Sequence, residues 1–458
     1  MTAQSLSELS SRLKGAAIGP DSAEYDDARN VWNGTVNKQP ALVVRCAGVD
    51  DVIASVNYAR GNGLGVSVRA GGHHVAGSSV IDGGLVVDLS GMRSVTVDPA
   101  TSTVRCEGGA LIGDVDAASQ AHALAVPLGL VSETGVAGLT LGGGLGWLRR
   151  KYGLSCDNLA GADVVTAAGQ LLHASASENP DLFWALRGGG WDMGVVTAFE
   201  YQAYPLGPEV FLTFVTYSRD EGKQVLRGFD DYMATAPEGA APLAVCWTFP
   251  EADVFPRELW GQQFVAVVGA YAGPADEGEK VMQPLRQLGT PLTDMSGPAP
   301  YLEVQKFFDE DYPRGRRYYW RSTYLSGLPD EAIDVLLELA DTRPSPLTSV
   351  DIWPLGGAIA RVGADESPFG HRQAPLGIGL ESNWDDPAAD AANIAWTREA
   401  SGKLAPSSTG GSYLNFEDPD DKSATANAYG AVNLARLLAV KQQYDPGNLF
   451  RSRRGLTG

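Results

Sequence analysis

The chain has 458 residues, 44% hydrophobic and 20% charged, so it is long enough for two or three globular domains and is not typical of disordered proteins. Its net charge of −20 argues against partners such as nucleic acid or an anionic membrane. Four isolated cysteines without a CxxC pair predict neither a metal site nor a disulfide scaffold, and the lack of an apolar leader or long apolar run predicts a cytoplasmic protein.

The first 206 residues predict an α+β arrangement of short strands, helices and glycine turns. Strands are expected at 41–45, 65–69, 85–89, 103–106, 162–166 and 195–201. Between the first two strands, a helical pattern begins with Asp50 as N-cap and ends at Gly61 and Gly63. A second helix is expected to begin at Asn179-Pro180, which is an N-cap followed by proline at the first helical position.

The character of the chain changes near Pro205, where the glycine clusters thin out. Alternating segments are found at 210–217, 242–248, 263–271, 317–325 and 376–383. Helical stretches such as 331–341 lie between them, which predicts an antiparallel sheet covered by helices in a second domain. A last helix is expected near 426–443, ended by Asp445-Pro446.

The segment Gly71-Gly72-His73 directly follows the strand at 65–69. Successive glycines allow backbone N–H groups to converge on an anion such as a pyrophosphate, and a histidine in such a loop lies beside the bound group. The segment is neither a Walker A loop nor a GxGxxG turn. By itself, the motif leaves two interpretations of His73, a ligand-binding residue or a loop histidine bonded to backbone.

A second glycine cluster spans 134–146, with six glycines in thirteen positions. Such a segment is expected to form neither a good helix nor a good strand. It either brings the backbone close to a ligand or forms a tightly packed turn. The basic run Arg149-Arg150-Lys151 follows, and it either faces a negative ligand or lies on the solvated surface.

These segments are followed by LRGGG at 186–190, GVVT at 194–197, Tyr413-x-Asn415 and KxxYDPGNLF at 441–450. Together they resemble the berberine-bridge-enzyme-like branch of the vanillyl-alcohol-oxidase flavoproteins, over nearly the whole chain. The resemblance implies a PCMH-type FAD-binding domain of two subdomains at 1–206, a substrate-binding domain at 207–405, and a C-terminal segment, 406–458, that returns to the FAD-binding domain.

The resemblance also implies that FAD is held by a single covalent bond from His73 to the flavin 8α carbon. The implied cofactor-binding residues are Arg69, Ala70, Gly71, Gly72, His73, Gly77, Ser78, Thr134, Gly135, Gly138, Gly142, Gly143, Gly146, Val196, Tyr413 and Asn415. Relatives with a second, thioether link carry a cysteine where this chain has Val131, so one bond is expected. Cys156 lies past the glycine run and is expected to be a buried structural cysteine.

Two further features of the resemblance concern the pocket. Trp191-Asp192-Met193 replaces the Gly-Asn-Phe type of tripeptide usual in relatives, which predicts a different local pocket shape. The small Thr134 occupies the place where the family gates oxygen, which favours an oxidase over a dehydrogenase.

The implied function is an FAD-dependent oxidase that removes a hydride from a small alcohol, amine or secondary metabolite and is reoxidised by O2. Such chemistry needs a proton acceptor. Tyr413 is the first candidate, provided that a neighbour lowers its pKa; otherwise it only packs on the flavin. Glu381 and His371 are the other candidates, with a surface carboxylate and a loop histidine as the alternatives.

Two other functions remain open from the sequence, namely oxidative ring closure in a biosynthetic pathway and flavin binding without turnover. The protein is expected to be a monomer or a homodimer.

Overall fold

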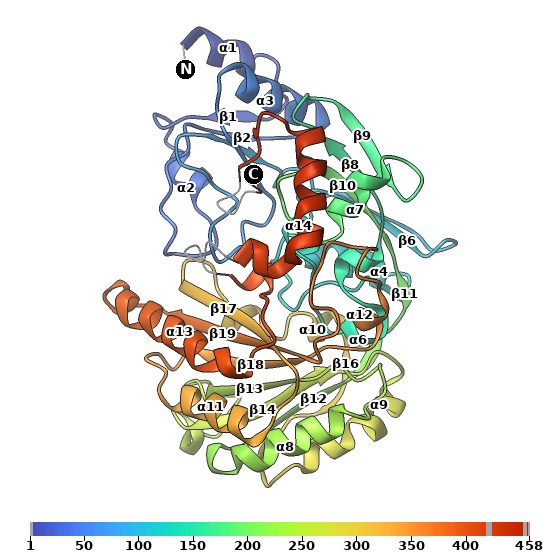
Figure 1. Cartoon of the computed structure of the whole chain (residues 1–458), viewed down its shortest axis with the longest axis vertical. Helices are drawn as coiled ribbons and strands as arrows, with labels where there is room; N and C mark the ends of the chain where they lie inside the picture. The colour runs from blue at the N-terminus through green and yellow to red at the C-terminus, as the bar shows by residue number, and fades with distance from the viewer. Residues whose placement is uncertain (1–2, 418–423, 452–455, 457–458) are drawn as a thin grey trace.

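The computed structural model describes residues 3–417, 424–451 and 456. Strands formed by residues 16–205 lie in the upper half of Figure 1, whereas those formed by residues 209–384 build one large sheet in the lower half. The chain then returns to the upper half in α14 (Ala424–Tyr444). This mixture of helices with mainly antiparallel sheets confirms the predicted α+β class.

The first sheet lies nearest the N-terminus. Its strands, in spatial order, are β1 (Ala16–Ile18), β2 (Leu42–Arg45), β4 (Leu85–Asp88) and β3 (Val66–Arg69). β2 and β3 both pair in parallel with β4, so they require the crossover helix α3 (Val49–Gly61) between them. The predicted N-cap was wrong, because α3 begins at Val49, and Asp50 lies within its first turn. Asp51 instead accepts N–H groups from the chain preceding β1 and from Ala47.

The second sheet is antiparallel, with the order β5 (Val95–Asp98), β6 (Thr103–Glu107), β10 (Val195–Gln202), β8 (Leu159–Val165) and β9 (Leu171–Ser175). A short pair, β7 (Leu124–Ala125) and β11 (Tyr204–Pro205), lies beside it. Helices α4 (Ile112–Gln120), α5 (Val136–Leu141), α6 (Arg149–Tyr152) and α7 (Pro180–Leu186) connect the strands.

Two local expectations for these helices need correction. The glycine cluster at 134–146 does contain a helix, α5, because Gly135 and Gly142 lie at its ends and only Gly138 lies inside it. Helix α7 begins at Pro180 as expected. Asn179 occupies the N-cap position as expected, but it adopts a left-handed conformation and its side-chain amide donates to the His173 carbonyl, so the side chain makes no capping hydrogen bond.

The large sheet forms the lower half. Its strands, in order, are β15 (Pro291–Asp294), β12 (Glu209–Ser218), β14 (Gln263–Ala270), β13 (Leu243–Thr248), β18 (Ser349–Pro354), β19 (Leu376–Trp384) and β17 (Arg317–Leu325), and β16 (Gly297–Pro300) also pairs with β12. Helices α8 (Gly222–Met233), α9 (Ala275–Met282), α11 (Asp330–Asp341) and α13 (Asp390–Leu404) contribute to a core with one face of this sheet. The helix-covered antiparallel sheet predicted from the alternating pattern is therefore confirmed.

Alternation along the strands decides which residues meet the helices. Ile352 of β18 and Ile378 of β19 pack against the helix side, whereas Asp351, Trp353 and Glu381 project from the opposite face, toward the upper half. The sequence analysis missed β18, whose residues are all buried. The uncovered face of the sheet therefore supplies side chains to the region between the two halves.

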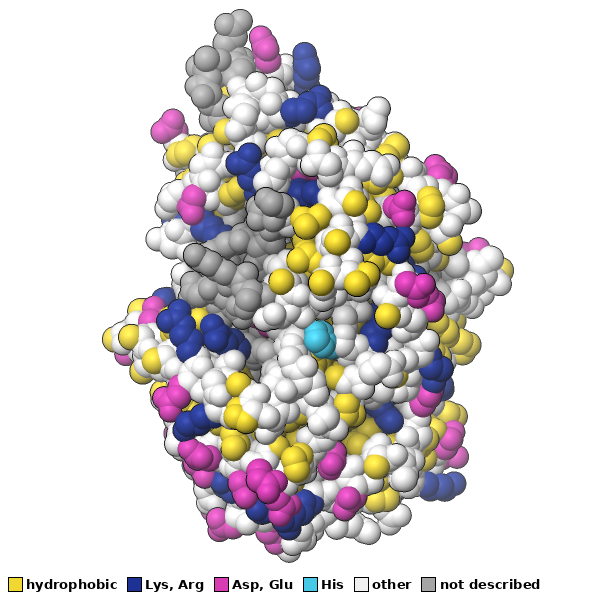
Figure 2. All heavy atoms as spheres, in the orientation of Figure 1, with side chains coloured by type: hydrophobic (Ala, Val, Ile, Leu, Met, Phe, Trp, Pro, Cys, Tyr) yellow, Lys and Arg dark blue, Asp and Glu magenta, His cyan; other side chains and the backbone are white. Residues whose placement is uncertain are grey.

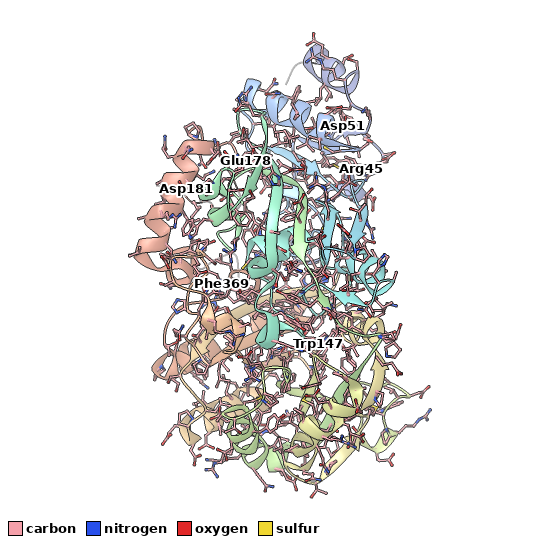
Figure 3. The ribbon with its side chains drawn as sticks, turned by 90° about the vertical axis from the view of Figure 1, so that its right-hand side faces the viewer. Arg45, Asp51, Trp147, Glu178, Asp181 and Phe369 are labelled. Carbon is pink, nitrogen blue, oxygen red and sulfur yellow. The ribbon has the colours of Figure 1, made fainter. Side chains whose placement is uncertain are left out.

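The basic run joins the two halves of the molecule. Arg149 donates to the carbonyls of Gly146, Ala241, Pro242 and Pro354, and Arg150 donates to four more carbonyls at 236, 237, 240 and 355. Both interpretations from the sequence were wrong for this pair, because the guanidinium groups are buried and bonded to protein backbone. Trp147, just before them, lies at the junction (Figure 3) and donates to the Val304 carbonyl.

The C-terminal motif fastens the returning chain to the first sheet. Lys441 and Asp445 form a buried ion pair with 2.6 Å between Nζ and Oδ2, and Asp445 also accepts the N–H groups of Leu449 and Phe450. Phe450 in turn bridges to Val66 of β3. The motif therefore has a structural role, which can be tested by measuring the stability of the protein after a substitution in the motif.

Replacing Asp445 with alanine is expected to destabilise the fold by about 3–5 kcal/mol, because Lys441 would remain buried without its partner. Thermal unfolding followed by circular dichroism measures this loss. The exposed pair between Arg436 of α14 and Asp181 provides the control, since Asp181→Ala should cost less than about 1 kcal/mol. Equal losses in both variants would contradict the assigned role of the buried pair.

On the face drawn in Figure 2, charged side chains of one sign do not form a single large patch. Acidic and basic side chains are both scattered over this face, and hydrophobic side chains gather over α14. Within the described part of the chain, no helix has the length and apolar composition needed to cross a membrane.

Candidate active site

A large cavity lies between the two halves of the molecule. Its empty volume, which includes the solvent at the open mouth, is about 1510 Å³. The upper lining comes from β3, the loop after it, α5 and residues 191–196. The lower lining comes from β18, β19 and the segment around Tyr413.

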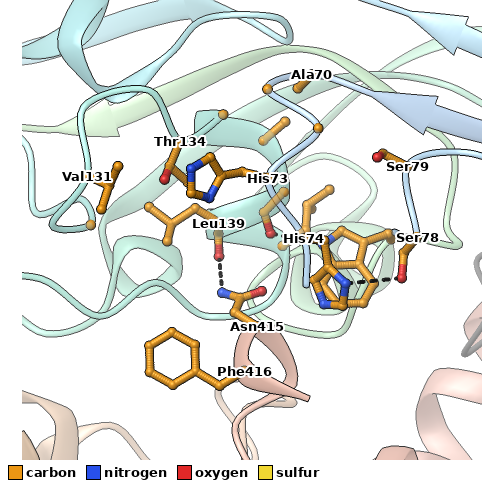
Figure 4. Close-up of a pocket in the computed structure, with 18 of the residues that line it drawn as sticks. Ala70, His73, His74, Ser78, Ser79, Val131, Thr134, Leu139, Asn415 and Phe416 are labelled. Carbon is orange, nitrogen blue, oxygen red and sulfur yellow. Dashed lines mark hydrogen bonds between the residues drawn. The ribbon is translucent and has the colours of Figure 1, made fainter. Parts of the chain in front are cut away.

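Most residues expected to bind the cofactor line this cavity. They are Ala70, Gly71, Gly72, His73, Ser78, Thr134, Gly135, Gly138, Val196, Tyr413 and Asn415. The fold thus brings four segments together, although some of them lie hundreds of residues apart in the sequence. Figure 4 shows His73 beside Thr134 and above Leu139, whose carbonyl accepts a hydrogen bond from the Asn415 amide.

Five other expected residues do not line the cavity, and each has a packing role. Arg69 pairs with the buried Asp88 of β4, and Gly77 packs against Val36. A side chain at Gly142 or Gly143 would collide with Asn415 or Phe369, and one at Gly146 would collide with the Leu128 carbonyl. These residues shape the loops around the cavity from outside its lining.

The two glycine-rich loops touch each other backbone to backbone. A Cβ on Gly71 would lie 2.5 Å from the Gly135 nitrogen, and a Cβ on Gly135 would lie 2.4 Å from the Gly71 nitrogen. Neither position tolerates a side chain unless the backbone shifts. The tight-packing interpretation of the glycine cluster is therefore confirmed at this contact, and the two packed loops also line the cavity.

His73 is held at the cavity by an aromatic stack. Its ring lies 4.2 Å from that of Trp32, which stacks on Tyr318 at 3.6 Å. Burial, followed by the nearby Arg314 charge, lowers the pKa of His73 to about 3, so its imidazole is neutral at pH 7. The Nε2 atom is buried and makes no hydrogen bond to any residue that the structure describes. A neutral imidazole with an unengaged ring nitrogen is suited to form a covalent bond to an electrophilic carbon.

The neighbouring histidine is already engaged. His74 Nε2 lies 3.1 Å from the Leu414 carbonyl, and its Nδ1 accepts the Ala76 N–H and lies 3.3 Å from Ser78 Oγ (Figure 4). Its ring meets the edge of Trp191, which donates to the Gly138 carbonyl. The unusual tripeptide at 191–193 therefore places an indole in the cavity lining.

Gly138 is a helical glycine that leaves room for a ligand. It lines the cavity in α5, and a Cβ there would meet no protein atom within 4 Å. Glycine inside a helix costs up to about 1 kcal/mol relative to alanine, so its presence calls for a reason other than helix stability. Open space for a bound group provides that reason.

Replacing Gly138 with a larger residue is expected to reduce flavin binding without unfolding the protein. Gly138→Leu should lower the flavin content of the purified protein several-fold, measured by absorbance near 450 nm against protein concentration. Gly402 is also helical and also has no atom within 4 Å of a Cβ, but it lies outside the cavity in α13. Gly402→Leu should retain full flavin content, and an equal loss in both variants would contradict the assignment.

Tyr413 is buried and its hydroxyl oxygen accepts three hydrogen bonds. The donors are the N–H groups of Gly144 and Leu145, at 3.1 and 3.2 Å, and the Asn415 amide at 2.8 Å. Burial nevertheless raises the pKa of Tyr413 to about 12, so its phenol stays protonated at neutral pH. This geometry favours a role in fixing the loop at 143–145 over the role of proton acceptor.

Glu381 lines the cavity together with a second carboxyl group, Asp351, which sequence reasoning missed. Tyr312 donates to Glu381 Oε2 at 2.8 Å. Burial and the nearby Asp351 charge raise the pKa of Glu381 well above its usual range, and burial raises the pKa of Asp351 to about 6. At neutral pH the two groups therefore share one negative charge, with the proton mainly on Glu381.

One candidate proton acceptor lies outside the cavity, and several aromatic residues form part of its lining. His371 is bonded to the Asn427 carbonyl outside the lining, and the buried Cys156 also lies outside it, whereas Val131 lies within it. Aromatic residues form much of the lower lining, namely Phe308, Tyr312, Trp320, Trp353 and Phe416.

Comparison with known proteins agrees with this geometry. An FAD-binding-domain model matches residues 40–175, and a model described as berberine and berberine like matches residues 412–457. The chain is 32% identical to (R)-6-hydroxynicotine oxidase of Paenarthrobacter nicotinovorans over 96% of both chains. It is 28% identical to xylooligosaccharide oxidase of Thermothelomyces thermophilus, over 96% of this chain and 92% of the other.

A solved structure extends the likeness to three dimensions. The crystal structure of 6-hydroxy-D-nicotine oxidase from Arthrobacter nicotinovorans superposes with a TM-score of 0.88 at 30% identity and covers 100% of both chains. The fold and cavity define a PCMH-type FAD-binding flavoprotein. The chain belongs to the berberine-bridge-enzyme-like FAD-linked oxidases. It is an FAD-linked oxidoreductase acting on a small organic substrate.

Proposed function

We propose that this enzyme is an FAD-dependent oxidase that holds its flavin through a single covalent bond at His73 and returns electrons to O2. The observation that carries the proposal is a neutral His73 in the cavity lining whose buried Nε2 makes no hydrogen bond within the described chain, in the same cavity as a carboxyl pair on the substrate sheet. Val131 stands where a second link would need a cysteine, which supports one bond rather than two.

The residues of this chain fit FAD at the upper lining. Gly71, Gly72 and Ser78 lie at the loop after β3, where backbone N–H groups suit a pyrophosphate, and Gly138 leaves space along α5. His73 would hold the ring system beside Thr134 (Figure 4). When bound, FAD supplies an acceptor for two electrons and one proton, taken from the substrate as a hydride.

The residues of the substrate sheet supply the remaining functions. The aromatic lining excludes water and orients the substrate carbon. The Asp351–Glu381 pair takes the proton from the substrate heteroatom, since one of its two carboxyl groups is ionised at neutral pH. Tyr413 and Asn415 fix the position of the glycine loop against the cavity. The two electrons and two protons removed from the substrate would then reduce O2 to hydrogen peroxide.

The test is peroxide release by purified holoenzyme with a panel of small alcohols, sugars and amines under air, measured by a coupled peroxidase assay. Release with at least one class, and its loss under anaerobic conditions with bleaching of the flavin colour, is expected. Flavin bleaching without peroxide formation on readmission of air would contradict the oxidase and indicate another electron acceptor. Absence of bleaching with every class would contradict the proposed reaction on these substrates.

A further inference from the structure

The Asp351–Glu381 pair arises from the register of β18 and β19. Asp351 lies opposite Gly379, and Glu381 lies opposite Ser349, so both carboxyl groups project from the same face of neighbouring strands. A Cβ on Gly379 would lie 3.0 Å from Glu381 Oε1 and 3.5 Å from Asp351 Cβ. The missing side chain at Gly379 therefore allows the two carboxyl groups to approach each other at the cavity.

One oxygen of this pair is buried and has no hydrogen-bond donor from the described part of the chain. Asp351 is 4% exposed, it lines the cavity, and its Oδ1 makes no hydrogen bond within the described chain. Glu381, by contrast, receives the Tyr312 hydroxyl. A buried carboxylate oxygen without a donor is costly, so it calls for a donor supplied by a ligand or a water molecule.

The negative charge of the pair has no cationic partner in the cavity lining. Among the described lining residues there is no lysine or arginine. Three guanidinium groups approach from outside, but Arg149 and Arg343 donate to backbone carbonyls, and Arg314 lies near Gly71 at the other side of the cavity. Arg343 lowers the pKa of Asp351 through its charge without a hydrogen bond to it.

Large aromatic rings surround the pair. Trp353 lies two residues along β18 from Asp351, and Trp320 of β17 lies opposite Glu381. Tyr312 and Phe416 complete this end of the lining, each with its ring next to that of Trp320, at 5.7 and 5.4 Å. Aromatic faces attract organic cations, and more so in a site from which water is excluded.

We infer that this end of the cavity binds a protonated amine, so the substrate of the proposed oxidase is a hydrophobic amine rather than a sugar or a neutral alcohol. The inference rests on the proposed function. The substrate ammonium group donates an N–H to Asp351 Oδ1 and lies against the aromatic rings. One N–H proton passes to the carboxyl pair and a hydride leaves the adjacent carbon for FAD, so the ammonium substrate becomes an iminium ion, which is a protonated imine.

A matched pair of unreactive probes tests the binding step apart from turnover. Benzyltrimethylammonium carries a positive charge and has no N–H to lose, whereas neopentylbenzene has the same shape with carbon in place of nitrogen. Each is titrated into the holoenzyme, and Kd is read from the change in the flavin absorbance spectrum. The cation is expected to bind about 30-fold more tightly than the neutral probe.

The same titrations with Asp351→Asn and Glu381→Gln separate the pair from general charge effects. Asp351→Asn is expected to abolish most of the preference, and Glu381→Gln to retain it in part. The control variant Glu258→Gln removes a charge from an exposed site on the same domain and should leave the preference unchanged. Equal binding of both probes by wild type, or a preference that survives Asp351→Asn, would overturn the inference.

Measuring peroxide release during turnover distinguishes a failure of this inference from a failure of the proposed function. Peroxide from N-methylbenzylamine but not from benzyl methyl ether supports both. Peroxide only from sugars or neutral alcohols leaves the oxidase in place and overturns the amine site. A strong preference for the cationic probe without peroxide from any compound supports the amine site and contradicts the oxidase.

Discussion

His73→Ala is expected to abolish covalent flavin completely. The variant lacks the only histidine nitrogen in the described cavity lining that is both buried and without a hydrogen bond. After acid precipitation, yellow colour should remain with the wild-type polypeptide and appear in the supernatant of the variant. Because the loops and Gly138 still fit the cofactor, the native variant should retain some FAD without a covalent bond.

His74→Ala is the matched control for this experiment, since His74 is adjacent and its nitrogens contact Leu414, Ala76 and Ser78. Its flavin should stay with the polypeptide after precipitation. Colour that washes off the wild type would show that the flavin is not covalently bound. Colour that survives in His73→Ala would show that another residue carries the link, with Cys156 as the next to test.

Asp351→Asn is expected to lower kcat by about 10²–10⁴-fold, the usual contribution of a positioned proton acceptor. The wild-type kcat should rise with pH through about 6, the pKa to which burial raises Asp351. Below that pH the pair carries two protons and cannot accept another. Above it, one carboxyl group is ionised and the reaction proceeds. Steady-state peroxide assays across pH 4.5–8.5 measure both effects.

In Asp351→Asn the rise in kcat near pH 6 should disappear or move, because Glu381 then titrates without a charged neighbour. Flavin content and melting temperature report whether the cavity is otherwise intact. An unchanged kcat with an unchanged pH profile would exclude the pair as proton acceptor. Tyr413→Phe provides the comparison, and a larger loss there would restore the tyrosine as the better candidate.

Much of the fold was predictable because its signals are local. The alternation at 317–325 and 376–383 coincides with β17 and β19, and Asn179-Pro180 marked the start of α7. Errors arose where tertiary contacts outweighed local preference. The strand β18 is short and buried on both faces, and α5 forms within a glycine cluster because its apolar residues are buried against the core.

The candidate site was predicted in part. The glycine loops and His73 could be recognised from their residue types alone. For example, only glycine permits the contact between residues 71 and 135. Arg149 and Arg150 show the opposite case. Their charges suggested a ligand or the surface, but their role depends on carbonyls more than eighty residues away in the chain.

The sequence by itself determined the short strands, the glycine loops with their histidine, and the family to which these motifs point, because each depends on neighbours within a few residues. Only the tertiary structure decided that Asp351 pairs with Glu381, that Trp32 stacks on His73, and that Tyr413 is held by Gly144 and Leu145. Strand register and domain packing set those contacts, and both depend on residues far apart in the chain.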